Sequence, residues 1–502
     1  LGRITSATAP DGGVTSTTFN GLTTTVTNAK GQVMTRVVDA MGRIKTATDP
    51  AGTMTYTYDA FGDVLTVTDP LGNVVSATYD IRGNKTGMTD PDLGTRSYVY
   101  NVLGQVTSQT DAKSQVTSFT YDLLGRMTQR SQPDQTDTWI YDTSPTKGKG
   151  KLYQAKTDTG YTRTHTYDSL GRPSSVTTID YAMSVTYDSA GRVATLTYPT
   201  GFAVKKVYNS YGYLSEVRKN ADNALIWQGN AFNASGQPTQ ATLGNGLNTN
   251  TTYQAQTGRL TRVITGTSNG SGIQDNNFTY DLLGNLLTRN DVKTGVVEDY
   301  HYDTMNRLTQ ADLTAPTTLT KTYTYNAIGN LMSKSDVGTY TYHATKKHAV
   351  ASIAGTVNTS FTYDANGNML TGLSRTYTWK SWDMPATIAI GSNTDTYGYD
   401  AEHNRVKRTT TGTGASDTYY IDARWDNGVN FEREIVGSNT YNRHTIYGGG
   451  APVAIYTSGA ATNLRYLHKD HLGSVVAITN ESGTLVERRS YDAHGRLRNT
   501  NG

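Results

Sequence analysis

The chain has 502 residues, of which 35% are hydrophobic and 17% charged, and its formal net charge is +3. This length predicts several domains or a repetitive assembly, because a single compact core rarely exceeds about 250–300 residues. The near-neutral charge balance argues against a nucleic-acid partner, the absence of cysteine excludes disulfides and thiolate metal sites, and no apolar run is long enough to span a membrane.

The chain opens in the middle of a repeated phrase. Leu1-Gly2-Arg3 matches the end of the phrase Tyr-Asp-x-x-Gly-Arg, so we expect residues 1–502 to be a fragment of a longer protein. Residues 38–43 are a copy that lacks the tyrosine. The full phrase then recurs every 21 residues, at Tyr58, Tyr79, Tyr100 and Tyr121. A fixed period of this size predicts a repeat architecture.

One repeat, residues 58–79, predicts two strands and two turns. Tyr58 ends a strand, residues 59–62 form a turn, residues 63–68 form a strand, residues 69–72 form a second turn, and residues 73–79 run back. Both turns have the pattern Asp-x-x-Gly, in which the carboxylate caps the turn amides and the glycine adopts the left-handed conformation. The pattern predicts an antiparallel hairpin with a glycine bulge in every repeat.

The same pattern extends over most of the chain. We single out the phrase residues as a structural repeat motif: Tyr58, Asp59, Gly62, Tyr79, Asp80, Gly83, Tyr100, Gly104, Tyr121, Asp122, Gly125, Arg126, Tyr167, Asp168, Gly171, Tyr187, Asp188, Gly191, Tyr280, Asp281, Gly284, Tyr363, Asp364 and Gly367. The chain also contains 35 tyrosines against 8 phenylalanines. We expect ladder packing between tyrosines of equivalent repeats, with exposed aromatic side chains that bind sugar or protein as the alternative.

The number of repeats predicts the architecture. About 18 repeats of two strands give about 36 strands, which at ~4.8 Å per strand form a ribbon ~170 Å wide. Open sheets rarely exceed about ten strands without curling. We therefore expect an all-β protein, an antiparallel hairpin ribbon coiled into a hollow β-shell with a water-lined inner face. A flat or twisted stack with both faces solvated is the competing arrangement.

The regular spacing breaks near residue 377. Residues 377–385 contain two of the five tryptophans, residues 447–456 begin with Tyr-Gly-Gly-Gly, and residues 466–475 read Tyr-Leu-His-Lys-Asp-His-Leu-Gly-Ser-Val. We expect a repeat array over residues 1–378 and a distinct segment over residues 379–502 that continues the shell.

These phrases and blocks carry a family resemblance. The Tyr-Asp phrases resemble the YD repeats of rearrangement-hotspot (Rhs) proteins, and related repeats occur in insecticidal toxin complexes, bacterial wall-associated toxins and teneurins. The block after Lys469 resembles the start of the Rhs-associated core, and its core-like motif is Asp470, His471, Leu472, Gly473 and Ser474.

The resemblance implies a function without catalysis for this region. It implies a shell of a secreted or cell-surface bacterial polymorphic toxin, which sequesters a toxin cargo located C-terminally in the same polypeptide. Immunity proteins, delivery proteins, glycans and cell-surface receptors are further partners that it suggests. The self-cleavage segment and the cargo are expected beyond residue 502, and Asp69-Pro70-Leu71-Gly72 is interpreted as a turn only.

The residues themselves suggest no catalytic, cofactor or metal site. His468 and His471 flank Asp470, but a third ligand is missing and a structural turn is the favoured interpretation. Gly266-Thr-Ser-Asn-Gly270 matches a nucleophile-elbow pattern and Gly448–Gly450 a phosphate loop, but neither precedes a predicted helix. Calcium at the repeated aspartates is an open alternative to turn capping.

Two other function classes remain open on the sequence. A structural or adhesive protein would use the same repeats as a cell-surface stalk or filament with carbohydrate- or protein-binding faces. An extracellular hydrolase is the weakest hypothesis, because no acid–base pair stands apart from the repeated turn aspartates.

Overall fold

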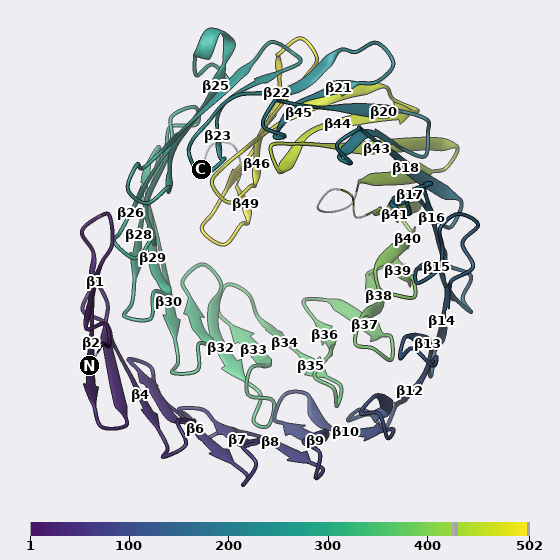
Figure 1. Cartoon of the computed structure of the whole chain (residues 1–502). Helices are drawn as coiled ribbons and strands as arrows, with labels where there is room; N and C mark the ends of the chain where they lie inside the picture. Colours follow the sequence, from purple (N-terminus) through teal and green to yellow (C-terminus); the bar gives the residue numbers. More distant parts are fainter. Residues whose placement is uncertain (1, 424, 426–429, 499–502) are drawn as a thin grey trace.

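The structure is a computed structural model that describes residues 2–423, 425 and 430–498. Its described part contains antiparallel strands and one short 3₁₀ turn, η1 (Thr267–Asn269), which confirms the predicted all-β shell (Figure 1). Leu1 of the opening tripeptide and the last four residues of the predicted 379–502 segment lie outside the described residues.

Most strands belong to one continuous sheet in which each strand pairs with the next along the chain. Its strands are β1 (Ser6–Thr8), β2 (Val14–Asn20), β3 (Thr23–Thr27), β4 (Val33–Val38), β5 (Ile44–Asp49), β6 (Gly52–Tyr58), β7 (Val64–Thr68), β8 (Val74–Tyr79), β9 (Lys85–Asp90), β10 (Gly94–Tyr100), β11 (Val106–Thr110), β12 (Val116–Tyr121), β13 (Met127–Gln132), β14 (Gln135–Tyr141), β15 (Leu152–Thr157), β16 (Thr162–Tyr167), β17 (Pro173–Thr178), β18 (Tyr181–Tyr187), β19 (Val193–Thr197), β20 (Ala203–Tyr208), β21 (Leu214–Lys219), β22 (Leu225–Phe232), β23 (Pro238–Leu243), β24 (Asn248–Tyr253), β25 (Leu260–Gly266), β26 (Gln274–Tyr280), β27 (Leu286–Asp291), β28 (Val296–Tyr302), β29 (Leu308–Ala315), β30 (Leu319–Tyr325), β31 (Leu331–Lys334), β32 (Gly338–Tyr342), β33 (Val350–Ala354) and β34 (Thr359–Ser360).

A second sheet and a separate last hairpin follow. The second sheet contains β35 (Thr362–Tyr363), β36 (Met369–Gly372), β37 (Arg375–Trp379), β38 (Pro385–Ile390), β39 (Asn393–Tyr399), β40 (Arg405–Thr411), β41 (Ser416–Ile421), β42 (Phe431–Val436), β43 (Asn439–Gly448), β44 (Ala451–Gly459), β45 (Asn463–Lys469), β46 (Val475–Thr479) and β47 (Leu485–Arg488), and the last hairpin contains β48 (Ser490–Tyr491) and β49 (Leu497–Arg498). The sheets separate at Phe361, whereas the sequence division at residue 378 stays a prediction.

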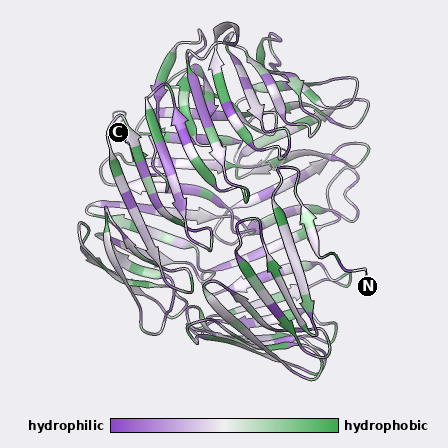
Figure 2. Ribbon diagram, turned by 90° about the vertical axis from the view of Figure 1, so that its left-hand side faces the viewer, coloured by the Kyte–Doolittle hydropathy of each residue, from purple (hydrophilic) through white to green (hydrophobic). Residues whose placement is uncertain are grey.

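The sheet coils into a hollow spiral. Its strands follow one another around a ring, and the later strands begin a second, inner revolution (Figure 1). The two termini lie toward opposite sides of the molecule when it is viewed from the side, and hydrophilic and hydrophobic residues are interspersed along the strands (Figure 2). We call residues 2–252 the first revolution and residues 253–498 the second revolution. The sheet is the wall of the shell.

The spiral narrows toward its C-terminal end. Hydrogen bonds between successive revolutions join residues 248 and 251 positions apart near the start of the chain, at Asp11–Arg259 and Lys30–Asp281. The separation rises to 287 positions for Arg96–Asp383 and falls to 234 for Asn245–Thr479. Where the last hairpin folds onto the wall within the second revolution, Arg289–Tyr491 and Lys321–Asp492 are 202 and 171 positions apart. The spiral therefore narrows toward its C-terminal end.

The Tyr-Asp turns follow the predicted turn chemistry. Asp122 Oδ1 accepts the backbone N–H groups of Leu124 and Arg126, both at 2.9 Å, and Asp122 Oδ2 accepts Arg126 Nε at 2.7 Å. Gly125 has a φ of +78°, and the strand register shifts at Tyr121, as expected for a glycine bulge. The alternate turns, which join the other ends of the strands, use the same capping: Asp69 Oδ1 accepts the N–H groups of Leu71 and Asn73.

Most phrase tyrosines bond to the neighbouring strand at the point where the preceding Tyr-Asp turn ends. The Tyr121 hydroxyl donates a 2.8 Å hydrogen bond to the carbonyl of Val106, the first residue of β11. The same bond, at 2.5–3.3 Å and to the first residue of the equivalent strand, is made by Tyr58, Tyr100, Tyr167, Tyr187, Tyr208, Tyr253, Tyr302, Tyr325, Tyr342, Tyr363, Tyr399 and Tyr491. The Arg of a phrase stacks on the tyrosine of the next one, as Arg172 does on Tyr187 at 4.1 Å.

These contacts replace the expected tyrosine ladder. Among the described residues, no ring contact joins one phrase tyrosine to the next. Successive phrase tyrosines lie two strands apart, which is roughly 9.6 Å and too far for direct stacking. Between successive tyrosines, the Arg guanidinium of one phrase stacks on the next tyrosine ring, and the tyrosine hydroxyl bonds to a backbone carbonyl of the neighbouring strand.

Gly125→Val should destabilise the protein by about 1–3 kcal/mol, because valine in the left-handed region is strained. A valine Cβ would also lie 3.0 Å from Gln105 Nε2. The free energy of unfolding in urea measures the loss. Gly272→Val is the control, since Gly272 lacks a left-handed φ and a Cβ there meets nothing within 4 Å. Equal stability of Gly125→Val and wild type would contradict the turn assignment.

Tyr121→Phe should cost about 0.5–1.5 kcal/mol, because it removes only the hydroxyl that joins two repeats. Urea unfolding measures this cost as well. Tyr211→Phe serves as the control, since Tyr211 is 84% exposed. A loss of the same size in both variants would show that the hydroxyl–carbonyl bond does not hold the repeats together.

Candidate functional site: the seam and the anchored last hairpin

Successive revolutions meet along a polar seam. Alternate turns of the first revolution contact Tyr-Asp turns of the second: Asn366 donates to Asp111 at 2.6 Å, and His348 pairs with Asp92 at 2.7 Å. Lys30 Nζ pairs with Asp281 at 2.8 Å. The two kinds of hairpin turn therefore form opposite edges of the ribbon, and one edge fits the other.

The opposite edge of the first revolution carries exposed apolar side chains. These residues occupy the middle positions of its Tyr-Asp turns and include Met41, Phe61, Ile81, Val102, Leu103, Leu123, Leu124 and Leu170. At the seam, Met305 and Ile328 occupy middle positions of second-revolution turns and are only partly exposed. The seam partly covers Met305 and Ile328, whereas Leu282 and Leu472 in other second-revolution turns stay exposed, as the apolar turn residues of the first-revolution edge do.

One part of the wall has two layers. Strands β41–β45 lie inside the ring formed by β16–β23 (Figure 1), and Met183 and Leu196 of the outer layer pack in one buried cluster with Phe431 and Ile446 of the inner layer. The expected water-lined inner face is therefore dry at this place. Side chains alternate along a strand, so Tyr187 shares the inner face with Met183.

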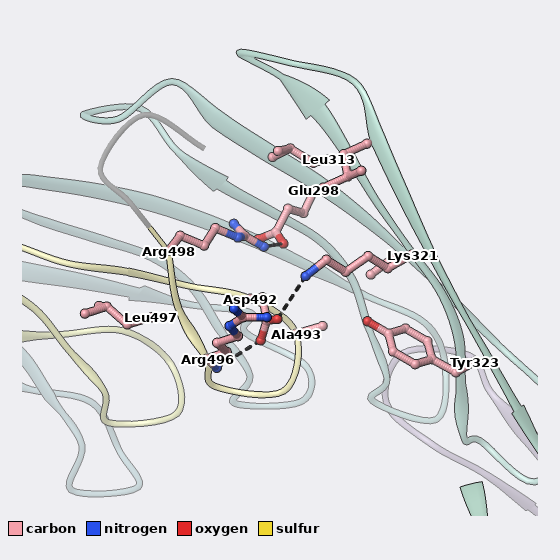
Figure 3. Close-up of a pocket in the computed structure, with 11 residues that line it drawn as sticks. Glu298, Leu313, Lys321, Tyr323, Asp492, Ala493, Arg496, Leu497 and Arg498 are labelled. Atoms are coloured by element: carbon pink, nitrogen blue, oxygen red, sulfur yellow. Dashed lines mark hydrogen bonds and ion pairs between the residues drawn. The ribbon is translucent and has the colours of Figure 1, made fainter. Parts of the chain in front are cut away.

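The last hairpin lies inside the ring (Figure 1) and contacts strands β28 and β30 of the wall (Figure 3). Glu298 on β28 is 1% exposed and accepts hydrogen bonds from Arg289 Nε at 2.7 Å and from Arg498 of the hairpin. Lys321 on β30 pairs with Asp492 at 3.1 Å and with Asp336 at 2.9 Å. Glu298 thus holds the hairpin through Arg498 of β49, and Lys321 holds it through Asp492, which directly follows β48.

The charges of this anchor are matched. Burial opposes the charged form of Asp492, but the backbone N–H of Arg496 and the Lys321 ammonium hold its pKa below the ordinary value. Burial likewise opposes the charge on Lys321, whose pKa is nevertheless raised by Asp336 and Asp492. Both groups stay ionised near neutral pH, so the hairpin is held by full charges.

The core-like motif is a Tyr-Asp type of turn. Asp470 Oδ1 accepts the N–H groups of Leu472 and Ser474, both at 2.9 Å, and Gly473 has a φ of +85°. The His471 ring packs against Phe278 at a tilt of 43° with centroids 4.5 Å apart, and His468 Nε2 lies 2.9 Å from Thr479 Oγ1. Burial lowers the pKa of His468 to about 4, so both geometry and charge state suit a structural imidazole.

Other sequence candidates also have structural explanations. Ser268 of the elbow pattern lies in η1, and Gln274 begins a strand soon after it. At Gly448 a Cβ would lie 2.7 Å from the indole of Trp227, which is buried, so glycine permits this close approach. Of the residues described, no three His, Asp or Glu side chains are grouped to share a metal ion, and none belongs to a helix suited to cross a bilayer.

Sequence reasoning missed the charges that join the revolutions. The position four residues before a phrase tyrosine holds Met54, Val75, Met183 and Val204 in apolar copies, and Met183 and Val204 pack in the buried cluster between the two layers. In four other copies it is charged, with a partner 171–287 positions further along the chain: Arg96–Asp383, Arg163–Asp400, Glu298–Arg498 and Lys321–Asp492. A charge at this position was the available signal.

Comparison with protein families identifies the repeats. The RHS repeat model matches residues 38–74, 58–95 and 100–137, and the teneurin YD-shell model matches residues 269–501. The chain is also similar to the tRNA3(Ser)-specific nuclease WapA of Bacillus spizizenii, with 30% identity, and to the tRNA nuclease WapA of Bacillus subtilis strain 168, with 27% identity, each over 139 residues. This match spans 27% of the chain and 6% of either relative.

Solved structures share the fold over nearly the whole chain. The crystal structure of TcdB2–TccC3–TEV aligns with a TM-score of 0.83 and 16% identity, over 99% of this chain and 30% of that one. The Photorhabdus luminescens Tc holotoxin pore aligns with a TM-score of 0.81 and 15% identity, over 99% of this chain and 30% of that one. The repeated phrases and the two family models place the chain among YD-repeat (Rhs) proteins, and the solved structures show the same shell fold.

Proposed function

We propose that the chain is part of a non-catalytic shell that encloses a toxin cargo carried C-terminally in the same polypeptide. The proposal is supported by the hollow coiled wall, by the likeness to Tc toxin shells and by the WapA relatives, whose names describe nucleases. The region itself would supply containment, and any toxic activity would belong to the cargo.

The observation that carries this proposal is the position of the last hairpin. Glu298 and Lys321 lie on inner-facing positions of β28 and β30, and they hold β48 and β49 against that face. The described chain therefore reaches Arg498 on the inner side of the wall, the side on which an enclosed cargo would lie. An anchor of buried charge pairs suits this role because it fixes one geometry, whereas an apolar contact would tolerate sliding.

The mechanism is one of exclusion. The hydrogen-bonded sheet and the polar seam would separate the lumen from the exterior, so that cargo inside could not reach its target. Within this proposal, residues 1–378 form most of the wall and residues 379–502 form its narrow end. A secreted or cell-surface location, and immunity, delivery, glycan or receptor partners, stay predictions.

A small folded reporter enzyme, fused after residue 502, should resist added protease and show little activity on a large substrate, because the wall would surround it. The same reporter fused before residue 1 is the control, since the first strand lies at the outer edge of the spiral (Figure 1). Protease resistance and reporter activity are measured on both fusions. Equal digestion of the two reporters would overturn the containment function.

Glu298→Ala should release the last hairpin, because Arg289 and Arg498 would keep buried charges without a partner, at a cost of about 3–5 kcal/mol. Hydrogen–deuterium exchange over residues 490–498 measures the release. Glu216→Ala is the control, since the Glu216–Arg218 pair is partly exposed and should matter by less than about 1 kcal/mol. Unchanged exchange in Glu298→Ala would show that these charges do not anchor the hairpin.

A further inference from the structure

A cleft of about 500 Å³ lies beside two successive Tyr-Asp turns of the first revolution. The turns are residues 209–213, between β20 and β21, and residues 233–237, between β22 and β23. Tyr211, Tyr213, Phe232, Asn209 and Asn230 line it, and the β43–β44 turn reaches it from the inner layer. A cleft of this size falls within the range of small-ligand sites.

The turn at residues 209–213 lacks the side-chain pair that most other Tyr-Asp turns contain. In most Tyr-Asp turns, the first residue is paired with the side chain four positions later: Asp with Arg or Asn, as in Asp188–Arg192 at 2.7 Å, and Asn with Gln, as in Asn233–Gln237 at 2.6 Å. Here the two positions are Asn209 and Tyr213. Gln237 accepts a hydrogen bond from the Asn233 amide, whereas Tyr213 makes no such bond with Asn209. Asn209 Oδ1 accepts the N–H groups of Tyr211 and Tyr213, and Asn209 Nδ2 has no hydrogen-bond partner in the described part of the chain.

The replacement leaves a pair of aromatic rings in solvent. Tyr211 is 84% exposed and Tyr213 is 66% exposed, and Phe232 completes the aromatic lining. Phe61 holds the same place in its own turn and is also exposed, but that turn has neither a second ring nor a carboxamide. The combination of rings and amides is therefore a property of this site and not of the repeat.

The cleft carries no full charge. Its lining has no Asp, Glu, Lys, Arg or His, and Arg192, which approaches Gly212, is already paired with Asp188. The Asn209 Nδ2 group can donate, and Asn230 donates its own Nδ2 to Thr242, which leaves its carbonyl oxygen to accept. The negative face of an aromatic ring attracts weakly positive C–H groups.

We propose that this cleft binds a neutral oligosaccharide, with a sugar ring stacked on Tyr211 or Tyr213 and its hydroxyls bonded to Asn209 and Asn230. Sugars match the site because they present C–H groups on one face and hydroxyls at the rim. A charged polymer lacks a counter-charge here, and a purely apolar ligand would leave the carboxamides without partners. The site is independent of the cargo and gives the shell a second function, attachment to a glycan.

The test uses the full chain and a panel of cello-, chito-, malto- and mannotetraose, with heparin as the charged comparison. Saturation-transfer NMR detects weak binding, and isothermal titration measures Kd. At least one tetraose should bind, and Tyr211→Ala/Tyr213→Ala should weaken it by about tenfold or more, because the stacking surface is lost.

A repair variant separates binding from folding. Asn209→Asp/Tyr213→Arg rebuilds the pair seen at Asp188–Arg192, so it should keep or raise the urea midpoint and still abolish sugar binding. Phe61→Ala, at the equivalent position of another turn, should leave Kd unchanged. The proposal is overturned if no tetraose binds, if only heparin binds, if the repair variant binds as well as wild type, or if Phe61→Ala weakens binding equally.

Discussion

The hydroxyl–carbonyl bond of the phrase tyrosine is the contact on which the wall depends. A β-ladder joins neighbouring strands, but it fixes neither the curvature of the ribbon nor the spacing of its repeats. Tyr121 and its equivalents add a side-chain link to the ladder, because each hydroxyl bonds to the first residue of the neighbouring strand, where the preceding Tyr-Asp turn ends. The Arg that pairs with the turn carboxylate also stacks on the next tyrosine. One phrase therefore closes a turn, places a glycine bulge and clamps two repeats.

The spiral follows from two different edges. Tyr-Asp turns form one edge of the ribbon and alternate turns the other, and the seam joins unlike edges of successive revolutions. A contact between unlike edges can repeat from one revolution to the next, which allows the ribbon to continue as a spiral. The narrowing of the later revolutions brings the second layer inside the first, where Phe431, Ile446 and Leu196 make the dry core.

Charges on the inner face mark where the wall meets later parts of the chain. The interior of the sheet offers few partners for an ionised side chain, and Glu298 would be costly there without Arg289 and Arg498. Such a pair holds a hairpin in one position more strictly than apolar packing does. The repeat aspartates, in contrast, accept backbone N–H groups of their own turns and pair with Arg or Asn side chains four residues later.

The sequence by itself determined the local structure. The capped turns begin with Asp or Asn, and their fourth residue has a positive φ; it is usually glycine but is Asn306 or His403 in two copies. The pattern at residues 58–79 therefore predicts the end of β6 and the bounds of β7 and β8 to within one residue. The number of repeats also determined that the ribbon must curl, because a sheet of this width cannot stay open. Only the tertiary structure decided how the revolutions meet. The partners of Arg96, Glu298 and Lys321 lie 171–287 residues away along the chain, and their pairing depends on the circumference of the spiral. Circumference is the sum of small curvatures over many strands, and no single repeat encodes it.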